Sequence, residues 1–199
     1  MAGWVACRYD LRVVGLGYIP RTGPVILAPN HVSLEDPVVL GVLARRAGRR
    51  ARAVAIQSLF ARPVLGRILR ATRQIPIDRD RSRPALHSAA AALKAGEAVL
   101  LYPEGQVARG QSSQPRVGVG ILALTTGAPV VPITSVGLEP RQPGDPWRRR
   151  AAVVVGPPVD LDRWRANPGR GAAKEAAAAV YGAIVAQRPA ATAFAGAPG

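Results

Sequence analysis

Short apolar segments that alternate with helical segments are the feature of this sequence that most restricts its fold. Several segments show the β-branched, apolar character of strands bounded by turn residues, and these are 9–15, 25–31, 53–56, 74–79, 98–105, 128–137 and 148–161. Between them lie segments with helical spacing of apolar residues, at 36–48, 58–72, 83–95, 118–127 and 170–187. Strands and helices that alternate along the whole chain predict an α/β fold.

The length of 199 residues favours one domain with a substantial core. We expect one central mixed β-sheet flanked by helices, with the domain covering residues 1–187. The segment "PVVPI" at 129–133 suits an edge strand or a pocket wall, because proline cannot donate a ladder hydrogen bond. The last residues, 188–199, are expected to form a disordered tail.

The charge of the chain is strongly basic, with 27 Lys and Arg against 12 Asp and Glu and a net charge of +15. Such a surface attracts polyanions or an anionic membrane face. Cys7 is the only cysteine, which excludes an intrachain disulfide and a cysteine metal cluster. We expect neither a signal peptide nor a membrane-spanning helix, and therefore a cytoplasmic protein that is peripheral to the inner face of the membrane.

The stretch "NHVSLED" carries one of the two histidines of the chain, His31, directly after an apolar segment. Catalytic residues are common at strand ends of α/β folds, because the loops there open outward. Asp36 follows five positions later, and on a regular helix it would lie roughly 140° from the same face, so the two side chains meet only if His31 precedes the helix. The pair is then a candidate general base with its orienting carboxylate. The alternative is that Asp36 only caps the helix in front of Pro37 while His31 fills a loop.

Two further strand ends carry candidate ligand-binding residues. "YPEG" places Glu104 and Gly105 in a turn, where glycine lets the backbone approach a ligand, and Arg109 follows as a possible phosphate partner. "IPIDR" places Arg79 at the end of another strand as a second phosphate-binding candidate. The alternatives are a solvated glutamate in an ordinary turn and a surface ion pair between Arg79 and a neighbouring aspartate.

Taken together, four sequence blocks resemble those of the glycerophospholipid acyltransferase family, whose best-known members acylate lysophosphatidic acid. "NHVSLED" resembles the N-H-x4-D block, "IPIDR" the second block, "YPEG" the F-P-E-G block and "VVPI" the V-P-I/V block. The resemblance runs from about Leu11 to Asp160, which is the motif-bearing core of the predicted domain. It implies the glycerol-3-phosphate acyltransferase-like form of the α/β fold.

The resemblance also implies the roles of individual residues. His31 would take the proton from an acceptor hydroxyl, and Asp36 would orient the imidazole. The hydroxyl would attack the thioester of acyl-CoA or acyl carrier protein as co-substrate, with no metal or other cofactor and no covalent acyl-enzyme. Glu104 and Gly105 would shape the acceptor site, and Arg79 would hold the phosphate of a lysophosphatidate-like glycerophospholipid.

The third block departs from the family pattern at one position that concerns the acceptor. The block usually reads F-P-E-G-T-R-S, and Val107 replaces its arginine here. The second block usually opens with glycine, and Arg73 stands at that position. Arg79, Arg73 or Arg109 could supply the missing charge, or the pocket is shaped for an acceptor with a less charged head group.

The basic surface further predicts peripheral membrane binding, through the amphipathic helix around 60–70 and an arginine-rich segment. The arginines of that segment are Arg45, Arg46, Arg49, Arg50 and Arg52. A basic nucleic-acid-binding protein is an alternative class, but aromatic residues make up only 5% and no nucleic-acid-binding motif is present, so no nucleic-acid partner is expected. A non-catalytic lipid-binding relative is the other alternative, and the intact His31 and Asp36 argue against it.

Overall fold

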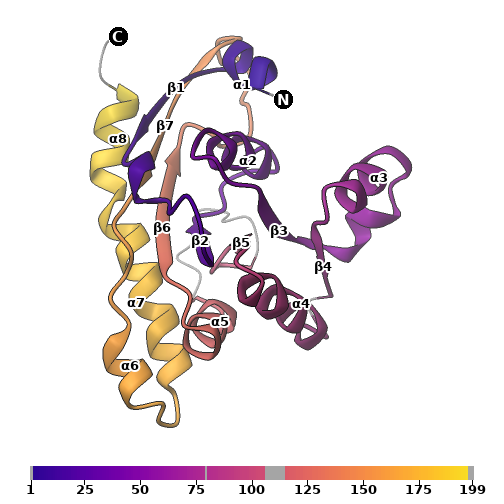
Figure 1. Ribbon diagram of the computed structural model, residues 1–199. Helices are drawn as coiled ribbons and strands as arrows, with labels where there is room; N and C mark the ends of the chain where they lie inside the picture. Colours follow the sequence, from indigo (N-terminus) through magenta and orange to yellow (C-terminus); the bar gives the residue numbers. More distant parts are fainter. Residues whose placement is uncertain (1, 79, 106–114, 197–199) are drawn as a thin grey trace.

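The computed structural model describes residues 2–78, 80–105 and 115–196, which form a seven-stranded β-sheet with helices on both faces (Figure 1). The strand order is β1-β7-β6-β2-β5-β3-β4, and all neighbours are parallel except β6 and β7. The strands are β1 (Tyr9–Val14), β2 (Val25–Pro29), β3 (Ala51–Ile56), β4 (Ile75–Ile77), β5 (Ala98–Leu100), β6 (Val130–Val136) and β7 (Arg149–Val155). The predicted single α/β domain with a central mixed sheet is confirmed.

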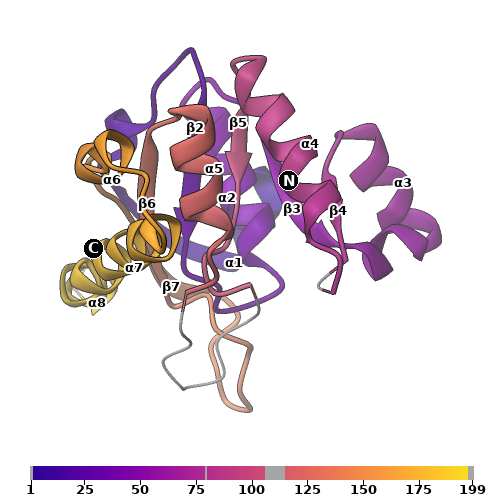
Figure 2. The same ribbon diagram turned by 90° about the horizontal axis from the view of Figure 1, so that it is seen from below.

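Successive side chains of a strand point to opposite faces of the sheet, and different helices cover the two faces. On one face Val25 and Leu27 of β2 pack with residues of α2, whereas on the other face Ile26 and Ala28 pack with residues of α4, α5 and α7 (Figure 2). The helices are α1 (Ala2–Arg8), α2 (Asp36–Arg46), α3 (Pro63–Ala71), α4 (Arg83–Lys94), α5 (Gly118–Thr126), α6 (Asp162–Ala166), α7 (Ala172–Ala186) and α8 (Arg188–Gly196), with 3-10 turns η1 (Leu16–Tyr18) and η2 (Gln57–Ala61). The predicted helices at 83–95, 118–127 and 170–187 correspond to α4, α5 and α7.

The proline-containing segment at 129–133 belongs to β6, which lies between β7 and β2 and is not an edge strand. Pro132 is tolerated there because of its register. Its carbonyl accepts a hydrogen bond from the backbone N of Gly156 (2.9 Å), one residue beyond the end of β7. Pro132 therefore lies at the end of the β6–β7 ladder. A proline at this position removes only one hydrogen bond from the sheet.

The expected disordered tail at 188–199 is wrong over most of its length, because α8 covers Arg188–Gly196. This helix packs against β6 and β7, and Ala191 is fully buried beside Val136 and Ala152. Alanine has the highest helix propensity, and its small side chain lets a helix lie close to a sheet. The composition of the segment is typical of disorder. The helix forms because β6 and β7, which are distant in the sequence, offer it an apolar surface to pack against.

The predicted amphipathic helix at 58–72 is divided into η2 and α3. Arg62 has an extended backbone in front of Pro63, as a residue preceding proline prefers, and Pro63 then begins α3 at a position that needs no N–H donor. Gly66 allows α3 to fold back on η2, because a Cβ at this position would lie 2.1 Å from the carbonyl oxygen of Phe60. Val64 and Ile68 of α3 remain exposed.

Arg49 is buried and stabilises the amino-terminal edge of the sheet. Its guanidinium donates to the carbonyl oxygens of Pro20 (2.8 Å), Gly23 (2.6 Å) and Gly96 (3.1 Å), and burial lowers the pKa of this side chain. Gly23 and Gly96 precede β2 and β5, so these loops meet where the parallel strands begin. Arg49 is therefore a structural residue and does not belong to an exposed basic surface, contrary to the expectation for the arginine-rich segment.

The packing of α5 against α7 gives a prediction for two glycines. A Cβ on Gly120 of α5 would lie 1.9 Å from the carbonyl oxygen of Ala173, so Gly120→Ala should lower the free energy of unfolding by about 1–3 kcal/mol or more. Gly182 of α7 has no such neighbour within 4 Å, and Gly182→Ala should raise that free energy by about 0.5–1 kcal/mol through helix propensity. Urea unfolding of both variants measures the direction of each change in the free energy of unfolding. Equal changes in the two variants would contradict the close approach of α5 to α7.

Candidate active site

The loop that follows β2 is held against β6 by the side chain of Asn30. Its amide nitrogen donates to the carbonyl oxygen of Ser135 (2.9 Å), and its amide oxygen accepts from the backbone N of Ser135 (2.7 Å). The backbone N of Asn30 donates to the carbonyl oxygen of Ile133 (3.2 Å). Asn30 thus continues the pairing of β2 with β6 beyond the last strand residue and fixes the starting point of the next residue, His31.

His31 lies in the turn before α2, and its side chain meets that of Asp36, as the spacing requires. The imidazole Nδ1 is 3.1 Å from Asp36 Oδ2, and 15% of the His31 side chain is exposed, whereas Asp36 is fully buried. An ionised carboxylate can only accept hydrogen bonds, so Nδ1 carries the proton of the neutral ring. The lone pair of Nε2 is then available to a substrate, which is the form that a general base needs.

Asp36 does not act as the helix cap that the sequence suggested. It is the first residue of α2, and Glu35 occupies the N-cap position. Its carboxylate accepts from the backbone N of Val32 (2.7 Å) and Ser33 (3.0 Å) and from the Ser33 hydroxyl (2.9 Å), all of which precede the helix. The Ser33–Asp36 spacing is that of a capping box, but here the carboxylate stabilises the loop that carries the catalytic candidate His31.

Tyr102, at the end of β5, stacks on the imidazole of His31. The ring centroids are 4.1 Å apart and the planes differ by 28°. The Tyr102 hydroxyl is buried and has no hydrogen-bond partner among the described residues. Burial, with a smaller contribution from the charge of Asp36, raises the pKa of Tyr102 well above its usual value, so the phenol stays neutral. The stacked ring and Asp36 together restrict the rotation of the His31 ring.

Glu104 is also close to His31, and only 5% of it is exposed. Burial raises the pKa of the Glu104 carboxyl, while a hydrogen bond from the His31 backbone and the charges of His31 and Arg188 act in the opposite direction. Its Oε2 atom is buried without a partner among the described residues. A buried, unsatisfied carboxylate oxygen at the site is available to a donor on a substrate. Glu104 is therefore at the site, and not a solvated turn residue.

Gly105 adopts a left-handed conformation with φ +67° and lies directly under the side chain of Arg116. A Cβ on Gly105 would be 2.4 Å from Cδ and 2.5 Å from Nε of Arg116, so glycine is required by both conformation and space. The backbone N of Arg116 donates to the carbonyl oxygen of Pro103 (2.8 Å). Arg116 is an exposed cation at the site that the sequence did not reveal, although it lies two residues before a predicted helix and follows the "YPEG" turn.

In its described residues, the structure does not show any of the other arginines predicted from the sequence at this site. Arg79 and Arg109 lie outside the described residues, so their predicted roles stay predictions. Arg73 precedes β4 and pairs with Glu97 (3.5 Å), which precedes β5. Both therefore lie at the amino-terminal edge of the sheet, whereas His31 lies at the carboxyl edge. Arg73 cannot replace the charge that Val107 lacks.

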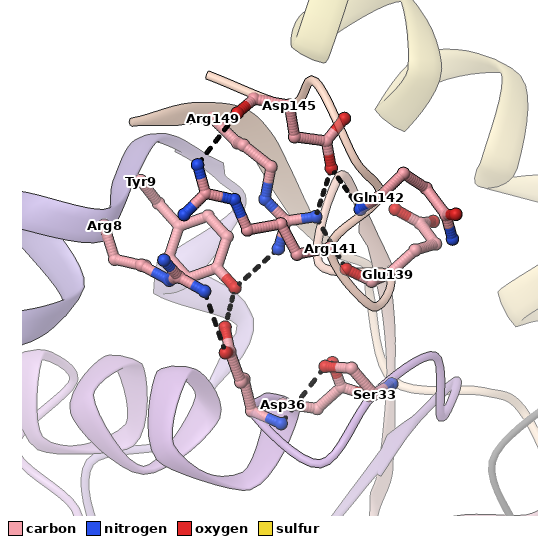
Figure 3. Close-up of polar contacts among 10 residues, drawn as sticks. Arg8, Tyr9, Ser33, Asp36, Glu139, Arg141, Gln142, Asp145 and Arg149 are labelled. Atoms are coloured by element: carbon pink, nitrogen blue, oxygen red, sulfur yellow. Dashed lines mark hydrogen bonds and ion pairs between the residues drawn. The ribbon is translucent and has the colours of Figure 1, made fainter. Parts of the chain in front are cut away.

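A second polar network stabilises the first turn of α2 from the side of β1 and β7 (Figure 3). Tyr9 donates a short hydrogen bond to the Glu35 carboxylate, and Arg149 donates to the Tyr9 hydroxyl (3.0 Å). Arg8 pairs with Glu35 at 3.5 Å, and Arg149 also donates to the carbonyl oxygen of Glu139 (2.7 Å). Burial, followed by the hydrogen bond to Glu35, raises the pKa of Tyr9. The network connects the amino-terminal segment and the β6–β7 connection to the His31 loop.

A histidine oriented by a buried carboxylate at the carboxyl edge of an α/β sheet is an arrangement for general-base chemistry. Comparisons with known proteins identify the family to which the chain belongs. The family model described as Acyltransferase matches residues 10–136, and the chain belongs to this acyltransferase family. The matched range contains all four blocks that carried the resemblance to glycerophospholipid acyltransferases.

Two relatives add detail. Lyso-ornithine lipid O-acyltransferase of Rhizobium meliloti (strain 1021) is 32% identical over 110 residues, which are 53% of this chain and 36% of that protein. The match thus spans little more than a third of that relative's length. The crystal structure of the 1-acyl-sn-glycerophosphate (LPA) acyltransferase PlsC from Thermotoga maritima superposes with a TM-score of 0.72 and 21% identity, covering 99% of this chain and 76% of that one. The predicted acyltransferase-like fold is confirmed.

The stacked ring of Tyr102 gives a prediction with a matched pair of variants. Tyr102→Phe keeps the ring and removes an unpaired buried hydroxyl, so it should raise the free energy of unfolding by about 1 kcal/mol and preserve acyltransferase activity. Tyr102→Leu removes the stacking, worth about 0.5–1.5 kcal/mol, and should lower kcat roughly tenfold with little change in KM. Urea unfolding and steady-state kinetics measure both effects, and an unchanged kcat in a folded Tyr102→Leu protein would contradict the positioning role.

Proposed function

We propose that this chain is an O-acyltransferase that moves a fatty acyl chain from a thioester donor to a hydroxyl group of a lysolipid. The observation that carries the proposal is the His31–Asp36 pair, in which the carboxylate holds Nδ1 and leaves Nε2 to the substrate. Membership of the acyltransferase family supports the reaction class. The position of the pair at the carboxyl edge of the sheet is the usual place for a ligand in open α/β folds.

The proposed reaction transfers the acyl group directly. Nε2 of His31 accepts the proton of the acceptor hydroxyl while the oxygen attacks the carbonyl carbon of the thioester. Asp36 stabilises the imidazolium that forms, as a buried carboxylate with fixed orientation can do without reorganisation. The tetrahedral intermediate collapses, the carbon–sulfur bond breaks, and the thiolate takes the proton from His31. The products are an ester and the free thiol of coenzyme A or of the acyl carrier protein.

The first-choice acceptor is a lysophosphatidate-like glycerophospholipid. Glu104 and Gly105 shape the acceptor pocket, and the exposed residue Arg116 lies over Gly105. Arg116 thus offers an exposed cation beside Gly105, in addition to the cations predicted at Arg79 and Arg109. A guanidinium binds a phosphate through charge-assisted hydrogen bonds.

A second candidate acceptor is a hydroxyl-bearing lysolipid without a phosphomonoester. The replacement of the usual arginine by Val107 favours it, as does the identity to a protein named for lyso-ornithine lipid. The chemistry at His31 and Asp36 would be the same for both acceptors. A panel of lysolipids tested for thiol release distinguishes them, since only the first acceptor depends on an arginine–phosphate contact.

The acceptor class also points to the place of action. Lysolipids reside in membranes, and the net charge of +15 favours an anionic surface such as the inner face of the cytoplasmic membrane. Among the described residues, no helix combines the length and the apolar character that crossing a bilayer requires. We infer that the domain reaches its acceptor at the membrane surface and takes its thioester donor from the cytoplasm.

Removal of the proposed base is the direct test of the reaction. His31→Ala should reduce thiol release from acyl-CoA in the presence of lysolipid by about 10²–10⁴-fold, while circular dichroism and urea unfolding stay close to wild type. Asp36→Asn should also lower activity, and it should lower stability because Asp36 accepts hydrogen bonds from Val32 and Ser33. Full activity in a folded His31→Ala protein would exclude the mechanism.

The acceptor phosphate is tested by three arginine variants. Arg116→Ala and Arg79→Ala should each raise the KM for lysophosphatidate about 10–150-fold, because a lost charge-assisted hydrogen bond costs roughly 1.5–3 kcal/mol, and should leave the KM for acyl-CoA nearly unchanged. Arg73→Ala, at the opposite edge of the sheet, is the matched control and should have no effect on either KM. If the wild type ignores lysophosphatidate and acylates an uncharged or zwitterionic lysolipid, the second acceptor is correct.

A further inference from the structure

The catalytic loop carries an exposed leucine that has no role in the site described above. Leu34 lies between His31 and Asp36 in the sequence and is 80% exposed. Trp147, at the end of the connection between β6 and β7, is 69% exposed. Single exposed apolar side chains are common on protein surfaces, but two large ones at the same edge of the sheet are candidates for contact with a membrane or a partner. Both residues lie at the carboxyl edge of the sheet, because β2 ends there, directly before the His31 loop, and β7 begins there.

Arginines connect these two apolar residues into one surface. Arg8 pairs with Glu35, the neighbour of Leu34, and its guanidinium carbon lies 5.4 Å from the centre of the Trp147 ring. Arg141 lies at 5.5 Å from the same ring. Arg148 follows Trp147 and is exposed, and it pairs with Asp10 at 3.3 Å. We name the surface formed by Leu34, Trp147, Arg8, Arg141 and Arg148 the docking rim.

The figures show that α1 and the connection from β6 to β7, which carry most of the docking rim, lie near α2. α1 and the connection from β6 to β7 lie together at the top of Figure 1, above the start of α2. In Figure 3, Arg8, Arg141 and Arg149 lie on one side of the segment that leads from Ser33 to Asp36. A partner that covers the docking rim would therefore also face the opening of the His31 site.

The arginine-rich segment expected to bind membranes lies elsewhere. α2 begins at the site and runs away from it, so Arg45 and Arg46 are about 15 Å further along the helix. Arg49 is buried against backbone carbonyls, and Arg52 pairs with Glu97 (3.2 Å) before β5. This segment is at the amino-terminal edge of the sheet. A flat bilayer that contacts it would leave His31 on the far side of the domain.

We infer that the docking rim binds an anionic lipid bilayer, with Leu34 and Trp147 inserted among the head groups and Arg8, Arg141 and Arg148 above them. The inference rests on the proposed function, because a lysolipid acceptor would then enter the site directly from the membrane. Tryptophan with an apolar body and a polar N–H is typical of the interface between lipid and water, and arginines favour anionic head groups. An acidic carrier protein would need the arginines but would leave Leu34 and Trp147 without an apolar partner.

Tryptophan fluorescence tests the insertion without reference to activity. In a Trp4→Phe variant, Trp147 is the exposed tryptophan among the described residues, since Trp164 is buried. We expect a blue shift of its emission and quenching by brominated lipid with phosphatidylglycerol–phosphatidylcholine vesicles at low salt, and little change with phosphatidylcholine alone. Emission that stays unchanged while the protein co-sediments with the vesicles would overturn the docking rim as the contact surface.

Matched variants test the orientation. Leu34→Ser and Trp147→Ser should each weaken co-sedimentation with the anionic vesicles about tenfold, whereas the combined Arg45→Ser, Arg46→Ser and Arg50→Ser variant at the opposite edge should bind much more like wild type. The reverse order of effects would overturn the inference. So would a dimer, or a complex with acyl carrier protein, that Trp147→Ser abolishes while vesicle binding persists.

An activity measurement separates failure of this inference from failure of the proposed function. Trp147→Ser should acylate a monomeric short-chain lysolipid at the wild-type rate and a vesicle-embedded lysolipid about tenfold more slowly. Equal loss on both acceptors would overturn the docking role of Trp147. No acylation by the wild type on either acceptor, together with intact vesicle binding, would refute the proposed reaction and leave the docking rim in place.

Discussion

The buried carboxylate of Asp36 is the group on which the site depends. It accepts from His31, from the backbone N atoms of Val32 and Ser33, and from the Ser33 hydroxyl, and none of its surface reaches solvent. A buried charge is strongly unfavourable unless hydrogen bonds replace its hydration. The loop therefore closes around Asp36 in one conformation, and that conformation also sets the orientation of the His31 ring. The hydrogen bonds of the buried Asp36 carboxylate thus determine both the conformation of the loop and the orientation of His31 as a base.

Much of the fold and of the His31–Asp36 pair could be predicted from the sequence, because both depend mainly on residues that are close together along the chain. The alternation of strands and helices predicted the mixed α/β sheet, and the spacing from His31 to Asp36 predicted that the histidine precedes the helix. The errors have a common origin in long-range contacts. Residues 188–196 form a helix because β6 and β7 present an apolar face, and Pro132 lies in an inner strand because its missing N–H falls at the end of a ladder. Neither fact is encoded in the neighbours of these residues along the chain.

The antiparallel pairing of β6 with β7 has a consequence beyond the architecture. Because β7 runs against β6, its first residue lies at the carboxyl edge, and the parallel strand β1 begins there too. Arg8, Tyr9 and Arg149 are thereby brought next to Glu35 and the first turn of α2. An all-parallel sheet would place these residues at the opposite edge. The one antiparallel pair thus brings the amino-terminal segment to the candidate active site.

The net charge of +15 divides into groups with different physical roles, which a sum over the sequence cannot show. At the amino-terminal edge, Arg49 satisfies buried carbonyl oxygens and Arg52 and Arg73 share Glu97, so much of this charge is used inside the fold. At the carboxyl edge, Arg116 is exposed and its side chain lies over Gly105. A solvent-exposed ion pair contributes only about 0–1 kcal/mol, so Arg148, which pairs with Asp10, can still attract an anionic ligand, whereas the buried Arg49 cannot. Arg45, Arg46 and Arg50 at the amino-terminal edge are exposed as well, so charge alone does not select the edge that meets an anionic surface. The exposed Leu34 and Trp147 distinguish the edge that holds His31, because a membrane surface offers apolar contacts in addition to charge.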